Sequence, residues 1–279
     1  MKKIIHITDI HCKEGILEQR FQLLIEQIVS TFKNSKDYIV VLTGDIVDEA
    51  SDYNYYLASK HLNKLIDAGF QVLCCPGNRD YGISSIGNKK FIPIFEDNFL
   101  VESTKSYPIK TIVHENIKDK SIAFIGLESM AKELEWTKET SLNGELGLHQ
   151  LARLELLLKD ADVIKADFLV IYLHHSPFST DHQYQLRDTE LLKNILMASI
   201  KPVDLMLFGH KHDGLCWHSH WGIPQIYGGG SSTLVENSPC VFRVIDPENN
   251  IPDNSIENHR FIKNYITTLK ENSLICENY

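Results

Sequence analysis

Short apolar runs alternate along the chain with longer stretches in which hydrophobic residues recur every three or four positions. The runs are rich in β-branched and aromatic residues, which is typical of buried strands; they are Ile4 to Thr8, Tyr38 to Leu42, Phe70 to Cys75, Ile122 to Ile125, Phe168 to Leu173 and Val203 to Phe208. The longer stretches have the spacing of helices with one buried face, and they lie at 17–32, 57–66, 148–158 and 191–196. This alternation predicts a layered α/β architecture.

The last third of the chain has a different pattern. Trp217 to Thr233 and Cys240 to Ile245 predict strands that are interrupted by glycines and a proline, and Ile262 to Leu269 predicts a short closing helix. The sequence contains no internal repeat and no convincing linker. We therefore expect a single domain over 1–279, with its core at 4–235 and a C-terminal strand and short helix within 240–279.

The composition is that of an ordinary globular protein, with 43% hydrophobic and 23% charged residues among 279. A net charge of −9 argues against nucleic acid as a partner, because sequence-independent binding requires a basic face. No apolar run approaches the roughly 20 residues that span a bilayer, and the apolar stretch after Met1 is too short for a signal peptide. The six cysteines form no C-x-x-C pair. We expect a cytoplasmic protein.

Polar residues follow five of the predicted strands. They are Asp9-Ile10-His11, Gly44-Asp45-Ile46-Val47-Asp48, Gly77-Asn78-Arg79-Asp80, His174-His175 and Gly209-His210-Lys211-His212. Layered α/β proteins build their sites on such loops. In an extended chain residues two apart share a face, so that Asp9 with His11, and His210 with His212, can point into one pocket. Carboxylate, imidazole and amide ligands together favour Mn, Fe, Zn or Co over Ca or Mg alone.

Each motif taken singly has an ordinary structural explanation. An Asp-x-His pair is common by chance, Gly44-Asp45 and Gly77-Asn78 are familiar in turns, and His174 could be a buried histidine with a hydrogen bond. Their occurrence in this order, each after a predicted strand, favours a metal centre.

In order and spacing these motifs resemble the signature of the calcineurin-like metallophosphoesterases, D-x-H, G-D-x-x-D, G-N-H-[DE], H and G-H-x-H, over residues 9–212. Gly144-Glu145-Leu146-Gly147 and Leu186-Arg187-Asp188 are similar to the branch that contains the class III cyclic-nucleotide phosphodiesterases. The resemblance implies an α/β fold (α+β in some schemes), a four-layer α/β/β/α sandwich of two mixed β-sheets flanked by helices. It also implies a binuclear metal centre at the strand ends.

Carried over by position, the resemblance implies two divalent or trivalent metal ions, Mn, Fe or Zn, with Asp45 bridging them. One ion would be bound by Asp9, His11 and His212, and the other by Asn78, His174 and His210. Two such cations can lower the pKa of a bridging water and stabilise the charge that develops on a phosphoryl group, so that hydroxide attacks phosphorus without a protein nucleophile.

Two further residues near these ligands have open roles. Alternation places His174 and His175 on opposite faces, and the position of Pro177 favours His174 as the ligand. His175 would then contact the substrate or support a ligand, although the reverse assignment stays open. Asp48 is expected to orient its loop or a ligand histidine, or to be a simple turn carboxylate.

Arg79 stands where the family has a histidine that is proposed to protonate the leaving group or to steady the phosphate. Arginine stays charged at neutral pH and cannot be the acid, but it can bind a phosphate through two hydrogen bonds, with Asp80 as the expected partner that aims it. His175 and His182 are candidates for the acid. A similar Gly-Asn-Arg-Asp occurs in the UDP-diacylglucosamine pyrophosphohydrolases of lipid A synthesis.

These inferences predict a binuclear metal-dependent phosphohydrolase with a small phosphorylated substrate. The favoured reaction is that of a phosphodiesterase on cyclic nucleotides, glycerophosphodiesters or other small diesters, with Arg79 and His175 as the catalytic side chains. Arg79 motivates two alternatives, a pyrophosphohydrolase of nucleotide-linked substrates and an inactive metal-bound scaffold.

Overall fold

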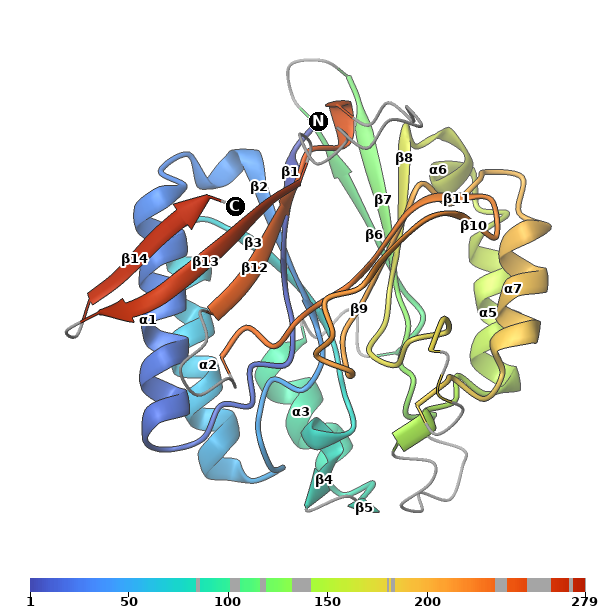
Figure 1. The fold of residues 1–279 in the computed structure, drawn as a ribbon. Helices are drawn as coiled ribbons and strands as arrows, with labels where there is room; N and C mark the ends of the chain where they lie inside the picture. The colour runs from blue at the N-terminus through green and yellow to red at the C-terminus, as the bar shows by residue number, and fades with distance from the viewer. Residues whose placement is uncertain are drawn as a thin grey trace.

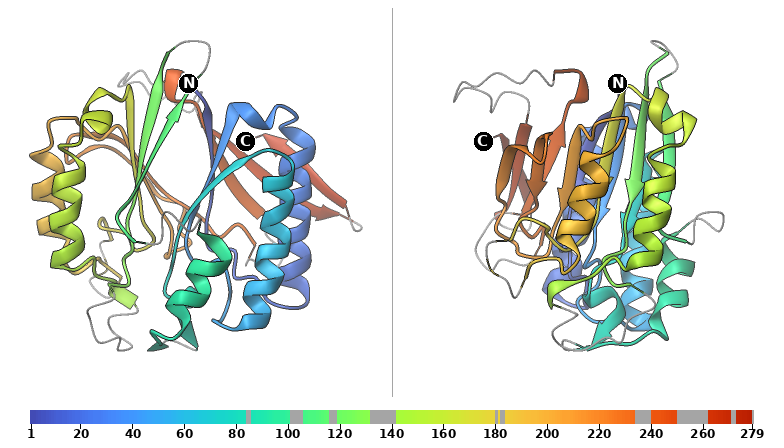
Figure 2. Two further views of the ribbon diagram at one scale, coloured as in Figure 1. Left: turned by 180° about the vertical axis from the view of Figure 1, so that it is seen from behind. Right: turned by 90° about the vertical axis from the view of Figure 1, so that its right-hand side faces the viewer.

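A computed structural model of the protein describes residues 1–83, 86–100, 106–115, 119–131, 142–179, 181, 184–233, 240–249, 262–270 and 273–278. Its main strands form two six-stranded sheets that pack face to face, with helices on both outer sides (Figure 1). The same four layers are visible from behind and from the side (Figure 2). Two mixed β-sheets flanked by helices are the predicted fold, and this prediction is confirmed.

The first sheet has the order β14-β13-β12-β1-β2-β3. Its strands are β1 (Lys3–Ile7), β2 (Tyr38–Thr43), β3 (Gln71–Cys75), β12 (Cys240–Ile245), β13 (Ile262–Lys270) and β14 (Ser273–Asn278). Strands β1, β2 and β3 run parallel, and β12 joins β1 antiparallel. The carboxyl ends of the three parallel strands therefore lie along one edge.

The second sheet has the order β10-β11-β9-β8-β7-β6. Its strands are β6 (Ile109–His114), β7 (Ser121–Gly126), β8 (Phe168–Tyr172), β9 (Leu205–Phe208), β10 (Cys216–His220) and β11 (Ile223–Gly228). Strands β7, β8, β9 and β11 are parallel neighbours, whereas β6 and β10 pair antiparallel at the two edges. A small hairpin, β4 (Gly82–Ile83) with β5 (Ile86–Gly87), lies outside both sheets.

Helices α1 (Ile16–Thr31) and α2 (Asp52–Asp67) cover the first sheet, and α3 (Phe91–Phe99) lies beside the lower part of α2 in Figure 1. Helices α5 (Leu148–Leu157), α6 (Ala161–Lys165) and α7 (Thr189–Met197) lie on the side of the second sheet. Ser51 caps α2 because its side chain accepts a hydrogen bond from Asn54 N. No helix among the described residues combines the length and the apolar character that crossing a bilayer requires.

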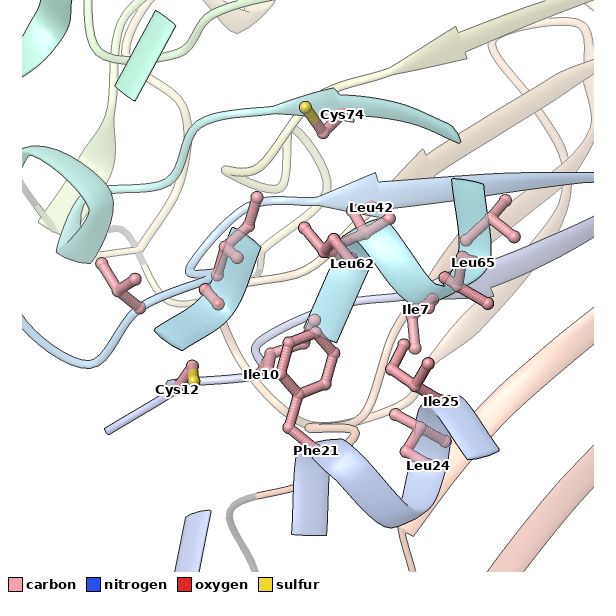
Figure 3. Close-up of a cluster of buried hydrophobic side chains, with 14 of the residues drawn as sticks. Ile7, Ile10, Cys12, Phe21, Leu24, Ile25, Leu42, Leu62, Leu65 and Cys74 are labelled. Carbon is pink, nitrogen blue, oxygen red and sulfur yellow. The ribbon is translucent and has the colours of Figure 1, made fainter. Parts of the chain in front are cut away.

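Strand alternation divides the buried side chains among three layers. Ile5 and Ile7 of β1 pack toward the helices, where Figure 3 shows Phe21, Leu24 and Ile25 of α1 close to Ile7. Ile4 belongs instead to the cluster between the two sheets, with residues such as Val41 of β2 and Phe124 of β7. A third cluster lies between the second sheet and α5 and α7. Burial on both faces explains why these strands appear in the sequence as continuous apolar runs.

The structure corrects the prediction for the C-terminal region. The helix expected from Ile262 to Leu269 is wrong, because this segment forms β13, which pairs antiparallel with β12 and β14. Its apolar residues have helical spacing, but the segment also contains isoleucines, threonines and a tyrosine, which suit a strand, and it extends the open edge of β12. Strand β6 and helix α3 are also missing from the elements that the sequence predicts.

Candidate metal centre

Five loops meet where the parallel strands of the two sheets end. The loops after β1 and β2 are joined by backbone hydrogen bonds from Asp9 N to Gly44 O (3.1 Å) and from His11 N to Asp45 O (2.9 Å). The loops after β8 and β9 are joined by the bond from Gly209 N to His174 O (3.0 Å). The fifth loop, after β3, is bonded through Arg79 N to Asp45 Oδ1 (2.8 Å). All seven predicted ligands lie on these loops.

The structure brings Asp9, His11 and His212 together as one group, whose ligand atoms lie within 4.8 Å of one another. His212 Nε2 is 3.1 Å from Asp9 Oδ1 and 3.3 Å from His11 Nε2. Asp9 and His11 are buried, and the side chain of His212 is about one-third exposed. These are the three side chains that the family resemblance assigns to one metal ion.

A second group surrounds His174. Its Nε2 lies 3.2 Å from Asn78 Oδ1, 3.2 Å from His210 Nδ1 and 3.5 Å from Asp45 Oδ1. The other carboxylate oxygen of Asp45 lies 3.7 Å from His11 Nε2. Asp45 therefore faces both groups, as a bridging ligand must. The donors fit a pair of metal ions, because buried carboxylate, amide and imidazole atoms converge without a lysine or arginine between them among the described contacts.

The protonation of this cluster suits metal binding. Burial acts to raise the pKa of Asp9, but the hydrogen bond from His212 and the surrounding histidines hold it well below its usual range. Burial and the nearby His174 lower the pKa of His210 to about 4, so that its imidazole is neutral at pH 7. Neutral imidazole and ionised carboxylate are the forms that bind metals.

Asp48, which is expected to orient a ligand histidine or its own loop, lies beside His11. Its Oδ1 lies 3.4 Å from His11 Nδ1, and its Oδ2 lies 3.1 Å from Lys13 Nζ. The neighbouring His11 lowers the pKa of Asp48 to about 2, against the effect of burial. An ionised carboxylate at Nδ1 directs the other ring nitrogen, Nε2, toward the centre.

The backbone at the ligands differs from the extended conformation that the sequence argument assumed. Five of the eight described non-glycine residues with positive φ are predicted ligands: Asp9 (51°), His11 (50°), Asp45 (49°), His210 (75°) and His212 (56°). Non-glycine residues rarely adopt this left-handed backbone conformation, which costs on the order of 1 kcal/mol or more per residue. Concentration of such strain at one place is typical of a functional site.

Two glycines allow the loops to approach closely. A Cβ atom on Gly44, whose φ is +85°, would lie 2.5 Å from His174 Nδ1, and one on Gly77 would lie 2.3 Å from Asp45 Oδ1. A side chain at either position would displace a predicted ligand. These glycines therefore bring the two sheets' loops within reach of one another.

The expected pairing of Asp80 with Arg79 is wrong. The buried Asp80 carboxylate instead accepts hydrogen bonds from Gly77 N (2.8 Å), Ile46 N (2.8 Å) and Val47 N (3.0 Å), so it joins the loops after β2 and β3. Burial and the positive charge of Arg79 act to lower the pKa of His212, although Asp9 and Asp45 outweigh them. Arg79 itself lies on the loop after β3, where its backbone N–H donates a hydrogen bond to Asp45 Oδ1 (2.8 Å).

His175 lies in the same cluster as His174 rather than on an opposite face. Its ring centroid is 4.9 Å from that of His174 and 4.3 Å from that of His210. Its Nδ1 is 2.7 Å from the hydroxyl of Ser129, a residue on the loop after β7 that the sequence reasoning missed. The sequence signal that could have indicated Ser129 is its position just after β7, another parallel strand of the second sheet. His182, the other candidate acid, lies outside the described residues.

A comparison with known families agrees with this geometry. The family model of the calcineurin-like phosphoesterases matches residues 2–214, which include all five motifs. The chain belongs to this family. Its members are metal-dependent phosphoester hydrolases with two metal ions.

Individual relatives are more distant. An uncharacterized metallophosphoesterase of Bacillus subtilis, YkuE, is 33% identical over 80 residues, or 29% of this chain; the match spans only 27% of that relative's length. A dimetal phosphatase from Danio rerio has a TM-score of 0.59 at 15% identity, with 88% of this chain and 94% of that one covered. GAP50, the anchor in the inner membrane complex of Plasmodium, has a TM-score of 0.61 at 13% identity, covering 100% and 87%. At such identities the likeness concerns the fold.

Proposed function

We propose that the protein is a binuclear metal-dependent phosphodiesterase that acts on cyclic nucleotides, glycerophosphodiesters or other small diesters. The supporting observation is the position of Asp45, with one carboxylate oxygen 3.7 Å from His11 and the other 3.5 Å from His174. A carboxylate between two donor groups suits two adjacent cations rather than one. The mixed donors favour Mn, Fe or Zn.

When bound, the two ions would supply hydroxide from water near neutral pH and would stabilise negative charge on the phosphoryl group. The chain's own residues would orient the metal ligands and bind the phosphoryl group. Asp48 is expected to orient His11, and the permanently charged Arg79, whose backbone N–H is bonded to Asp45, is the candidate to bind a phosphoryl oxygen. We expect His175, whose ring packs against that of His210, to contact the phosphoryl group. No serine or cysteine nucleophile is required.

Arg79 supports one alternative, a pyrophosphohydrolase. Since arginine cannot donate a proton at neutral pH, a phosphate leaving group, which needs little protonation, would suit this site. A second alternative is a metal-bound scaffold, and the Plasmodium anchor shows that a protein of this fold can have a structural role. The convergence of all seven predicted ligands favours an enzyme over a scaffold.

The assignment to the class III phosphodiesterase branch, the single domain over 1–279 and the cytoplasmic location stay predictions. The assignment to this branch depends on the flanking motifs. The matched family model ends at residue 214, before the C-terminal strands β12 to β14.

The test is an assay of the purified protein with Mn²⁺ on three substrates: bis-p-nitrophenyl phosphate, p-nitrophenyl phosphate and ADP-ribose. We expect the diester to be cleaved with the highest kcat/KM. Asp45→Asn should lower kcat at least 10³-fold, because loss of the bridging charge removes several kcal/mol of transition-state stabilisation. The matched control is Asp67→Asn at the exposed end of α2, which should leave kcat unchanged.

Each outcome identifies one function. Fastest cleavage of ADP-ribose would favour the pyrophosphohydrolase. Two bound ions without turnover of any substrate would favour the scaffold. Equal activity of Asp45→Asn and the native protein would contradict the metal mechanism.

A further inference from the structure

Two adjacent histidines at the metal centre have different hydrogen-bond partners at the same ring nitrogen. His174 Nδ1 lies 2.7 Å from the carbonyl oxygen of Thr43, and His175 Nδ1 lies 2.7 Å from the hydroxyl oxygen of Ser129. All four residues are fully buried. In a neutral imidazole one nitrogen carries hydrogen and the other a lone pair, and the partner decides which is which.

The partner of His174 permits one tautomer. A carbonyl oxygen can only accept, so His174 Nδ1 carries the hydrogen and Nε2 carries the lone pair. That Nε2 faces Asn78 Oδ1 and His210 Nδ1, both at 3.2 Å. The same reasoning holds for His210, whose Nε2 lies 2.8 Å from Leu142 O, which leaves its Nδ1 as the ligand atom.

The partner of His175 has the opposite effect. The Ser129 oxygen accepts a hydrogen bond from the backbone N–H of His175 (3.2 Å), so this contact leaves the hydroxyl hydrogen to be donated elsewhere. Within the described part of the chain, the hydrogen-bond partners of this hydroxyl belong to His175 alone. A buried hydroxyl donates its hydrogen, and Nδ1 at 2.7 Å is the acceptor. Nε2 of His175 then carries the ring hydrogen.

We infer that Ser129 is a positioning residue that makes His175 a hydrogen-bond donor to the phosphoryl group instead of a metal ligand. Distances alone do not separate the two roles, because ligand atoms of His174, His175 and His210 lie within 4.8 Å of one another. A protonated Nε2 has no lone pair for a metal, but it can donate to a phosphoryl oxygen.

The backbone of Gly144 lies against the His175 ring on another side. Its φ is +68°, and a Cβ atom there would lie 2.4 Å from Nδ1 of His175, so only glycine leaves room for the ring in this place. Glu145 N, the next residue, donates to Ser129 O (2.8 Å) and ties this segment to the loop that carries the serine. The contact with phosphate rests on the proposed function, whereas the tautomer does not.

The first experiment counts metal ions in the Zn²⁺-loaded protein by mass spectrometry. We expect two ions per chain in the native protein and in His175→Gln, and a loss of about one ion in His174→Gln. A loss of one ion from His175→Gln with two retained in His174→Gln would overturn the inference, because His175 would then be the ligand.

The second experiment reads the tautomers by long-range ¹H–¹⁵N NMR with ¹⁵N-labelled histidine, with His174→Gln and His175→Gln to assign the signals. We expect a protonated Nε2 in His175 and a protonated Nδ1 in His174, with and without Zn²⁺. In Ser129→Ala the His175 signals should change to a mixture of tautomers, and Ser129→Thr should restore them. A protonated Nδ1 in native His175 would overturn the inference.

The third experiment measures binding of inorganic phosphate to the Zn²⁺ protein by calorimetry. Ser129→Ala should weaken it about ten-fold with both ions retained, and Ser129→Thr should recover most of the loss, since one charge-assisted hydrogen bond is at stake. The matched control is Ser199→Ala, whose hydroxyl bonds to Lys201 O after α7 and should not affect phosphate binding. Unchanged binding in Ser129→Ala would contradict the positioning role.

These readouts separate this inference from the proposed function. A protein that binds two ions and phosphate but cleaves no phosphoester would refute the phosphodiesterase and still test Ser129. A protein without metal would refute the proposed centre, and the NMR spectra of its histidines would still decide the tautomer.

Discussion

The loops of the first sheet and those of the second hold their candidate ligands by different means. The loops after β1 and β2 are bonded through their backbones, and the Asp80 carboxylate joins the loops after β2 and β3 through three N–H groups. After β8 and β9 the loops share the bond from Gly209 to His174, and the imidazole rings pack against one another. The second pair also depends on the first sheet, because His210 N donates to both carboxylate oxygens of Asp9 (3.1 Å each).

This difference indicates how the site is built. Asp9, His11, Asp45 and Asn78 come from a frame whose hydrogen bonds form on folding. His174, His210 and His212 come from loops whose position relative to that frame depends on a few side chains and, we infer, on bound metal. We therefore expect the loops after β8 and β9 to depend more on bound metal than the loops after β1 to β3.

Removal of the metal ions should have the largest effect. At metal concentrations of about 100 times Kd, each occupied site stabilises the fold by about 2.7 kcal/mol, so EDTA should lower the free energy of unfolding by about 5 kcal/mol. Hydrogen exchange should increase more in the loops after β8 and β9 than in those after β1 to β3. Equal increases in both would break the comparison. Asp45→Asn should show a smaller EDTA effect.

Asp80→Ala should break the frame of the first sheet. It would leave three buried N–H groups without their acceptor, and we expect a loss of about 4 kcal/mol in the free energy of unfolding, measured with urea. Asp80→Asn keeps one acceptor oxygen and should lose about half as much. Asp67→Ala, an exposed aspartate on α2, is the control and should stay within about 0.5 kcal/mol of the native protein. If Asp80→Ala lost no more free energy of unfolding than Asp67→Ala, the proposed role of the Asp80 carboxylate would be contradicted.

Gly209→Ala tests the contact between the two halves. The added Cβ atom would lie 2.0 Å from Thr8 Oγ1 and 2.4 Å from Asp9 Oδ2, so the loops after β1 and β9 must separate. We expect a loss of about 2 kcal/mol and at least ten-fold weaker Mn²⁺ binding, followed by calorimetry. Gly230→Ala places its Cβ atom 3.8 Å from His212 O, which is ordinary contact, and serves as the control. Metal binding that is lost equally in both variants would argue against a specific contact.

The smallest effect concerns pH and His6, which braces the first sheet through Thr43 Oγ1 (2.9 Å). Burial and the charge of Arg243 lower the pKa of His6 from 6.5 to about 3. The unfolded chain therefore binds the proton more readily, and this contribution to stability is complete above pH 6.5 and is lost as the pH falls toward 3. Between pH 6 and 5 the native protein should lose about 1 kcal/mol more than His6→Asn, as urea unfolding would measure. Parallel pH profiles of the two proteins would contradict this.

Much of the site could be predicted because its residues follow strands that are buried on both faces. Such strands appear as continuous apolar runs, so their ends, and the ligands after them, can be located without a structure. The helix expected at Ile262 failed because its apolar spacing suits a helix, whereas the open edge of β12 decided its conformation. Spacing along the chain does not contain that information.

The supporting residues could not be predicted, because their partners are distant in the sequence. Ser129 and His175 are separated by 46 positions, and Asp80 is separated from Ile46 by 34. Asp80 follows Arg79 directly, which favoured the wrong pairing. Contacts of this kind depend on how the strands are ordered in the two sheets.

The left-handed backbone at the ligands has a consequence for protein engineering. Seven side chains copied onto the loops of another α/β scaffold would not reproduce this centre, since five of them belong to residues whose backbone has a positive φ. A host loop would have to reproduce that conformation without help from glycine, because a glycine at any of these positions would remove the ligand itself. Transplantation of this chemistry would therefore require the five loops and their bracing hydrogen bonds as one unit.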